Sequence, residues 1–157
     1  MLFECFQHTI LIKIFVSNSN FIVQGLKSLP LTVYGDGSQT RSFCFVDDLI
    51  KGMMMFMESD FLGPVNIGNP DEISIADFAK EIIKLTGTNQ KVVYRPLPEN
   101  DPLKRRPDIS KAKRVLNWSP KVSRSSGLKL TYDYFLNLSN DQLIQKEHNN
   151  FKNYIKF

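Results

Sequence analysis

The sequence contains few of the side chains that most often carry chemistry: two cysteines, two histidines and one tryptophan in 157 residues. Cys5 and Cys44 form neither a C-x-x-C pair nor a metal-ligand spacing, which excludes a disulfide framework and favours a reducing compartment. His8 lies in an apolar stretch and His148 in a polar tail, each without a neighbouring nucleophile or carboxylate. We therefore expect no catalytic residue and no metal ligand in this chain.

The sequence also lacks the motifs that bind nucleotide cofactors. The string GDGSQTR at 35–41 has no third glycine at the G-x-G-x-x-G spacing, and no helical pattern begins there. There is no P-loop, and none of the five tyrosines starts a Tyr-x-x-x-Lys pair. We expect no cofactor-binding residue, and we expect the chain to be unable to catalyse a reaction alone.

Long apolar runs are missing as well. The most apolar stretch, at 1–16, is interrupted by Glu4, His8 and Lys13, and it is shorter than the roughly 20 residues of a membrane-spanning helix. It has neither the positive start nor the cleavage site of a secretory signal. The sequence therefore predicts no membrane span.

Positive charge is concentrated in one region. The net charge is only +4, yet six cations fall between 104 and 114 around a single acidic residue, Asp108. An RNA-binding segment would interleave aromatic residues with these cations, and there are none, so we expect no nucleic-acid partner. A small phosphorylated ligand fits this charge pattern better.

Two arginines are candidate anion ligands. Arg41 follows a Gly-rich turn and precedes an apolar segment, where its guanidinium fork suits a phosphate; the alternative is a surface arginine paired with Asp36 or Asp47. Arg106 precedes Pro107-Asp108-Ile109-Ser110, which fixes its loop against a helix start. Both interpretations of Arg41 fit the sequence alone.

Strand and helix patterns alternate at short intervals, which predicts an α/β protein with too few strands for a complete doubly wound sheet. Asp47 and Asp48 lie where a helix N-terminus favours negative charge, and in the same helix we expect a buried stripe of Val46, Leu49, Ile50, Met53 and Met57. Strands are predicted at 31–34, 42–46, 63–70 and 91–97, and helices at 20–28, 46–57, 74–86, 110–116 and 127–138. We expect Ser74 to cap the third helix and Gly87 to end it, and Ser110 to cap the fourth.

Three strings, at 30–53, 63–82 and 99–128, resemble the extended short-chain dehydrogenases/reductases that act on nucleotide sugars. GSQTRSF together with RRPDISKAK is most similar to the UDP-glucuronate decarboxylase branch, also called UDP-xylose synthase. The resemblance covers about 16–138. It implies the C-terminal, small substrate-binding region of an extended Rossmann-type enzyme, with the cofactor loop and the Tyr-x-x-x-Lys pair in the other half.

The resemblance also implies roles for individual residues. Arg41 and Arg106 match the arginines that reach the diphosphate of a UDP-sugar, Tyr34 and Gln39 match positions at the nucleotide end, and Ser19 and Asn20 align at the entry to this region. The implied reaction oxidises C4 of UDP-glucuronate with NAD, releases carbon dioxide and returns the hydride to give UDP-xylose. NAD is thus the expected cofactor of the complete enzyme.

The resemblance divides the chain into 1–16, a divergent and misread or replaced start; 17–138, the nucleotide-sugar-binding region; and 139–157, a polar tail. It implies a homodimer and a cytoplasmic location, or a Golgi-associated one if the complete protein carries an N-terminal anchor. The alternatives are part of another nucleotide-sugar epimerase or 4,6-dehydratase, and a non-catalytic truncated product that pairs with full-length subunits.

Overall fold

The computed structural model describes residues 20–138. Residues 20–26 form a helix that buries Phe21, Ile22 and Val23, and β1 (Leu31–Tyr34) follows. The other elements are β2 (Thr40–Ser42), α2 (Val46–Met57), β3 (Glu72–Ser74), α3 (Ile75–Thr86), β4 (Val92–Arg95), β5 (Lys104–Arg105), α4 (Ser110–Leu116) and α5 (Arg124–Leu136). The predicted α/β class is confirmed. The proposed boundaries at 16 and 138 stay predictions, and the segments 1–16 and 139–157 lie outside the described residues.

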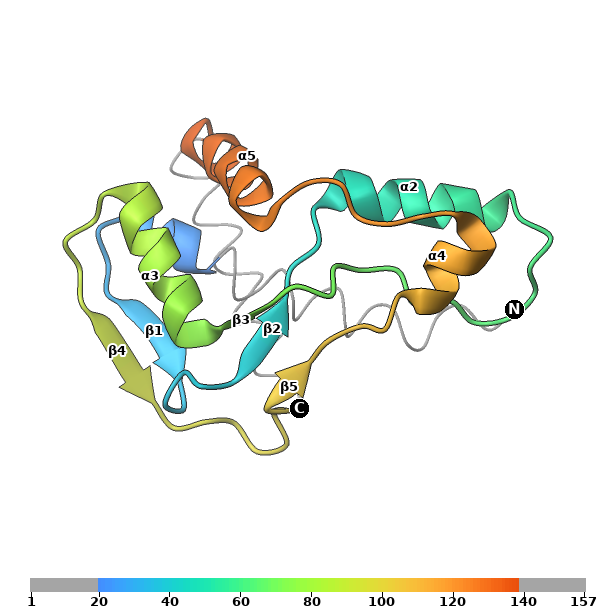
Figure 1. Cartoon of the computed structure of the whole chain (residues 1–157). Coiled ribbons are helices and arrows are strands. Elements are labelled where there is room, and N and C mark those ends of the chain that lie inside the picture. The colour runs from blue at the N-terminus through green and yellow to red at the C-terminus, as the bar shows by residue number, and fades with distance from the viewer. Residues whose placement is uncertain (1–19, 139–157) are drawn as a thin grey trace.

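The strands form two small sheets (Figure 1). β1 and β4 pair in parallel, with Leu31 opposite Val92 and Tyr34 opposite Arg95. β2 lies between β3, to which it is antiparallel, and β5, to which it is parallel. Both parallel pairs join segments that are far apart in the sequence. The loop after β1 leads into β2 and the loop after β4 leads into β5, so the pairing of β2 with β5 brings these two loops together.

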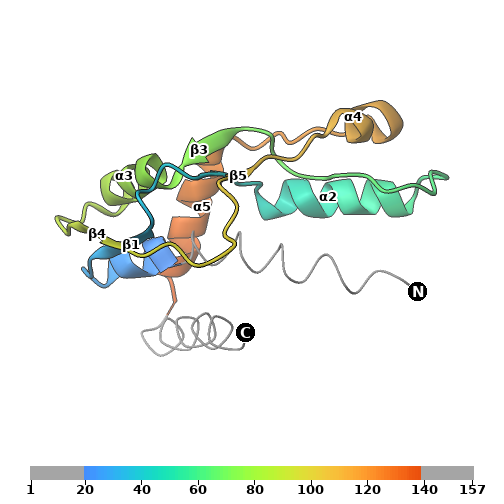
Figure 2. The same cartoon turned by 90° about the horizontal axis from the view of Figure 1, so that it is seen from below.

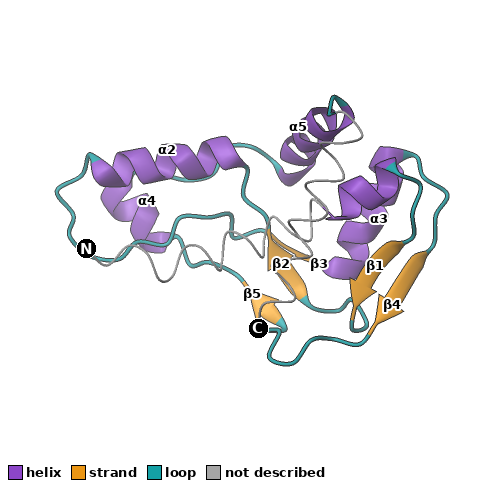
Figure 3. Ribbon diagram, turned by 180° about the vertical axis from the view of Figure 1, so that it is seen from behind, coloured by secondary structure: helices purple, strands orange, loops and turns teal. Residues whose placement is uncertain are grey.

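The main core lies between β1, α3 and the helix at 20–26. Its largest fully buried side chains are Ile22, Leu31, Val33, Phe78 and Ile82. Phe43 stacks on Phe78 with ring centroids 4.2 Å apart, which attaches the end of β2 to this core. Figure 3 shows α3 over the two-stranded sheet, and α5 beside α3.

A second core lies at the other end of the molecule, where α2 and α4 lie side by side (Figure 2). It is built from Ile109, Ala112, Leu116 and Trp118. A Cβ added at Gly52 of α2 would lie 2.8 Å from the Trp118 ring, so only glycine allows this helix to approach the indole so closely.

Helix α3 confirms the local signals in its sequence. The Ser74 hydroxyl accepts the N–H of Asp77 at 3.0 Å, and Gly87 ends the helix with φ of 65°. Ser74 is the predicted N-cap, and Gly87 adopts the left-handed conformation expected at a C-cap.

The predicted buried stripe of α2 is wrong. Val46, Ile50, Met53 and Met57 are exposed, Met57 to 74%, and Leu49 is half-buried, whereas the buried positions are Asp48 and Gly52. The helix is apolar over a wide arc, and the part of that arc around Gly52 packs on Trp118. The apolar spacing therefore predicted the helix correctly, but it did not show which face of the helix would be buried.

Three predicted boundaries also need correction. The strand expected at 42–46 lies instead at Thr40–Ser42, so it both starts and ends earlier. The last helix starts at Arg124 rather than at Gly127. Residues 63–70 form no strand, because no described strand pairs with them; side chains bind this segment instead, as when Lys111 donates to the Pro64 carbonyl at 3.1 Å.

The expected cap of α4 is also different from the observed one. Ser110 is the first residue of that helix, and the N-cap residue is Ile109, which has no capping side chain. The Asp108 carboxylate, one residue earlier, accepts both the N–H and the hydroxyl of Ser110, at 2.9 and 2.6 Å. Asp108 and Ser110 are both residue types that occur at helix starts, so the local sequence did not decide where the helix begins.

Candidate functional site

Arg41 lies on β2, and its guanidinium is held by three acceptors. Nη2 donates to the Asp101 carboxylate at 2.8 Å, and Nη1 donates to the carbonyls of Thr40 at 2.7 Å and Pro102 at 2.8 Å. The Arg41 side chain is only 12% exposed. Its acidic partner is therefore Asp101, 60 residues away, and neither Asp36 nor Asp47.

Arg106 directly follows β5, and its guanidinium is far more accessible. The side chain is 64% exposed, and Nη1 lies 4.0 Å from Oε2 of Glu72. Glu72 already accepts the Thr40 hydroxyl at 2.6 Å through its other oxygen. An exposed ion pair at this distance contributes little stability, so the Arg106 head group is available to a ligand.

The parallel pairing of β2 with β5 brings the two arginine-containing strings together. Arg41 is directly opposite Arg105, and Arg106 is one position further along the chain. Because side chains alternate along a strand, Thr40 faces Glu72 and Arg41 leaves from the opposite side of β2. Arg41 and Arg106 are thus on neighbouring segments but contact different carboxylates, and their convergence on one ligand stays a prediction.

Beside Arg106 there is an open depression of about 300 Å³. Its lining includes Lys113 and Asp108, so two cations face one carboxylate. The pKa of Asp108 is lowered, first by the hydrogen bonds from Ser110 and to a smaller extent by the charge of Arg106. The volume is at the lower end of the range for small-molecule sites. Asp108 therefore stays ionised and offsets part of the positive charge there.

The other predicted ligand residues are placed differently. Gln39 is 5% exposed, and its amide donates to the Tyr34 carbonyl at 2.5 Å, which closes the turn between β1 and β2. Tyr34 is the last residue of β1, and Asn20 begins the helix at 20–26. Ser19 lies outside the described residues. A ligand role for these four side chains stays a prediction.

The glycine turn between β1 and β2 is filled by the protein itself. Gly35 and Gly37 have φ of 70° and 80°. A Cβ at Gly37 would lie 2.9 Å from Ala76 Cβ, and one at Gly35 would lie 3.2 Å from Leu97. A dinucleotide cradle uses glycine to let a pyrophosphate approach the backbone. These two glycines admit Ala76 and Leu97 instead, so this turn does not fit the NAD pyrophosphate.

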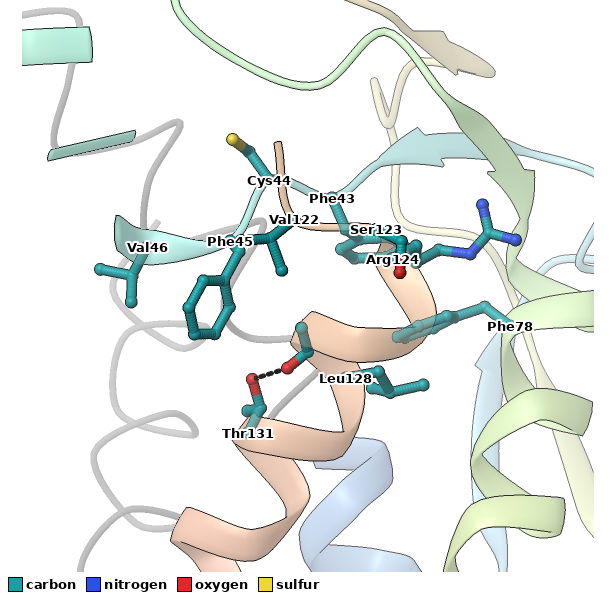
Figure 4. A pocket seen from close by; sticks show the side chains of 11 residues that line it. Phe43, Cys44, Phe45, Val46, Phe78, Val122, Ser123, Arg124, Leu128 and Thr131 are labelled. Atoms are coloured by element: carbon teal, nitrogen blue, oxygen red, sulfur yellow. Dashed lines mark hydrogen bonds between the residues drawn. The ribbon is translucent and has the colours of Figure 1, made fainter. Parts of the chain in front are cut away.

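An apolar pocket between the segment that follows β2 and the start of α5 is too small for a nucleotide sugar. Figure 4 shows Phe43, Phe45, Phe78 and Leu128 around it, and its volume is about 60 Å³. Small-molecule sites are commonly about 300 Å³ or larger. It is a packing gap at the start of α5.

Arg124, at the rim of this pocket, has a structural role that the sequence did not suggest. It donates to both Glu81 oxygens, at 3.0 and 3.2 Å, and to Asp71 at 2.7 Å. These partners raise its pKa, Glu81 most strongly. Arg124 therefore ties the start of α5 to α3. Asp101 and Glu72 were also missed, since their partners lie 60 and 32 residues away along the chain.

Within residues 20–138 no group of three or more histidine, cysteine, aspartate or glutamate side chains is arranged to hold a metal ion. In the same range, no helix has the length and apolar character needed to span a bilayer.

A sequence profile of the GDP-mannose 4,6-dehydratase family matches residues 13–131. The chain belongs to this family. It is 52% identical over 112 residues to UDP-glucuronic acid decarboxylase 4 of Arabidopsis thaliana, a match that covers 71% of this chain and 25% of the relative. Over 117 residues it is 47% identical to UDP-glucuronic acid decarboxylase 1 of Danio rerio, covering 74% of this chain and 28% of the relative. The chain therefore spans about a quarter of the length of these relatives.

Solved structures of similar proteins share the fold. UDP-glucuronic acid 4-epimerase from Bacillus cereus, in complex with UDP-glucuronic acid and NAD, matches with a TM-score of 0.74 at 36% identity, covering 78% of this chain and 40% of the epimerase. An epimerase of Methanothermobacter thermautotrophicus matches with a TM-score of 0.76 at 32% identity, covering 83% and 39%. The arrangement of short strands and helices is thus that of the nucleotide-sugar epimerases and dehydratases.

Proposed function

We propose that this chain is the nucleotide-sugar-binding part of a UDP-glucuronate decarboxylase, which converts UDP-glucuronate to UDP-xylose and carbon dioxide. The observation that carries the proposal is the 52% identity to an Arabidopsis decarboxylase of that name, against 36% to the UDP-glucuronic acid 4-epimerase. The higher identity favours a decarboxylase over an epimerase or a 4,6-dehydratase.

In this proposal the chain's own task is to bind the diphosphate. Guanidinium groups bind phosphate oxygens through charge-assisted, often paired hydrogen bonds. Arg106 has an exposed head group beside the 300 Å³ depression, and Arg41 lies on the neighbouring strand, opposite Arg105. Lys113 also lines the depression and adds positive charge there.

The complete enzyme would use NAD as the oxidant at C4 and as the source of the returned hydride. The glycine turn at Gly35 and Gly37 does not fit the NAD pyrophosphate, so we assign no part of the cofactor site to it. We expect the isolated chain to release no carbon dioxide from UDP-glucuronate. We further propose that the complete enzyme is a cytoplasmic homodimer, which light scattering and cell fractionation would test.

Isothermal titration of the chain with UDP tests the proposal. Arg41→Ala and Arg106→Ala should each weaken binding by about 1–3 kcal/mol, the scale of a lost charge-assisted hydrogen bond. Arg114→Ala is the matched control, because Arg114 is an exposed cation of the same region that does not line the depression. Unchanged UDP affinity in both test variants would exclude the diphosphate assignment.

The base specificity requires a second titration. The family profile carries the name of an enzyme of GDP-mannose, whereas the most similar relatives named above act as UDP-glucuronic acid decarboxylases. UDP should therefore bind more tightly than GDP. A preference for GDP would favour the dehydratase alternative.

A further inference from the structure

The short segment between β4 and β5 is held in one conformation where it meets Arg41. The Asp101 N–H donates to the Pro98 carbonyl at 3.3 Å, closing a turn in which Asn100 has φ of 62°. Two residues later, the Leu103 carbonyl accepts the Thr40 N–H at 2.8 Å, which fixes the segment to β2. Asn tolerates left-handed backbone better than most residues. Asp101 is therefore held between a turn and a strand contact.

This placement aligns two acceptors with one guanidinium. The Asp101 carboxylate and the Pro102 carbonyl each accept from Arg41 at 2.8 Å, and Asp101 is itself only 26% exposed. A guanidinium has five N–H donors in a fixed plane. Three go to Thr40, Pro102 and Asp101, so two are left that no atom of residues 20–138 receives in a hydrogen bond.

A long side chain bound at three points has already lost its rotational freedom before a ligand arrives. Ordering a free arginine on binding costs about 0.5–1.5 kcal/mol. A partly buried guanidinium with its orientation fixed avoids that cost, and its two remaining donors, Nε–H and one N–H of Nη2, are held in fixed directions. The carboxylate also lowers the net positive charge that Arg41 offers, so the benefit is in orientation rather than in charge.

From these contacts we infer that Asp101 is the positioning residue for Arg41, and that it orients the two remaining N–H donors of the guanidinium toward a diphosphate ligand. The inference rests on the proposed function for the identity of the ligand. The orientation itself is a property of the free chain and is measurable without one.

The first test uses no nucleotide. In arginine-detected NMR of the free chain, the Arg41 Nη signals, assigned by their loss in Arg41→Lys, should be resolved because rotation about the Nε–Cζ bond is hindered. Asp101→Ala should average or broaden them, while Glu99→Gln, an exposed carboxylate of the same segment, should leave them unchanged. Identical Arg41 signals in Asp101→Ala and wild type would overturn the inference.

The second test measures affinity for UDP and for inorganic pyrophosphate. Asp101→Ala should weaken both by about threefold to tenfold, the factor that corresponds to ordering one side chain. Asp101→Asn, whose amide oxygen still accepts from Arg41, should bind at least as tightly as wild type. In the Arg41→Ala background, Asp101→Ala should have no further effect. Additive losses in the double variant, or equal losses in Asp101→Ala and Asp101→Asn, would contradict positioning through Arg41.

The two proposals fail in different ways. If wild type binds pyrophosphate as tightly as UDP, the assignment of a UDP-sugar as the ligand is wrong. The effect of Asp101 on Arg41 still tests the positioning role in that case. If UDP binds and Arg41→Ala weakens it, but Asp101→Ala does not, the proposed function stands and the positioning role is excluded. Thermal melting of each variant separates these results from a loss of folding.

Discussion

The carboxylate of Asp48 accepts the backbone N–H of Val122 at 2.7 Å, although the two residues are 74 positions apart. The same oxygen accepts the N–H of Lys121 at 2.8 Å, and the Asp48 carbonyl accepts the Trp118 indole N–H at 3.1 Å. Asp48 is 3% exposed. The sequence predicted only a helix-terminal charge at this position; its tertiary role is to join the first turn of α2 to the chain between α4 and α5.

We predict that Asp48→Ala lowers the free energy of unfolding by about 3 kcal/mol, because it leaves two backbone N–H groups without their charged acceptor. Asp47→Ala is the matched control, since Asp47 is exposed in the same helical turn, and its loss should cost less than about 1 kcal/mol. Urea unfolding of both variants measures the difference. Equal losses would show that helix-terminal charge alone accounts for Asp48.

The Ser74 cap of α3 gives a smaller prediction. Ser74→Ala removes the acceptor of the Asp77 N–H and should lower stability by about 1 kcal/mol. Ser74→Thr keeps a hydroxyl at the same place and should recover most of that loss. The comparison is again made by urea unfolding, and a Thr variant as unstable as the Ala variant would argue against capping as the cause.

Two left-handed glycines separate backbone strain from packing. Gly87→Ala meets no atom within 4 Å and should cost about 1 kcal/mol for its φ of 65° alone. Gly37→Ala has φ of 80° and also places its Cβ 2.9 Å from Ala76, so it should cost roughly 2 kcal/mol more through overpacking. If the two variants have the same denaturant midpoint, the close contact at Ala76 is contradicted.

The thiol of Cys44 gives a prediction for alkaline pH. Burial, and secondly the negative charge of Asp48, raise the pKa of Cys44 to about 11. The folded chain therefore keeps this proton over a pH range in which the unfolded chain has lost it, so the contribution of Cys44 to stability is present below pH 9 and falls as the pH rises through about 11.

This contribution is isolated by comparing wild type with Cys44→Ser. The difference between their unfolding free energies should be constant up to pH 9 and should then shift against wild type toward pH 11. Lysine and tyrosine titrations are common to both proteins and cancel. A difference that stays flat over the whole range would show that Cys44 has an ordinary pKa.

The sequence by itself determined the elements whose signals are local. Ser74, the apolar spacing after it and Gly87 define α3 within 14 residues, and the turn at Gly35 and Gly37 follows from the need for left-handed backbone. The α/β class and the resemblance of the arginine-containing strings to those of nucleotide-sugar enzymes were also legible from residues close in sequence.

Only the tertiary structure decided the long-range partners. The pairing of β2 with β5, the ion pair of Arg41 with Asp101, the anchoring of Val122 by Asp48 and the exposure of the α2 stripe were not predicted. Each depends on which of several chemically equivalent groups comes within reach when distant segments pack. Hydrogen bonds and ion pairs act over a few ångströms, so spacing along the chain specifies a helix but leaves open which carboxylate an arginine will meet.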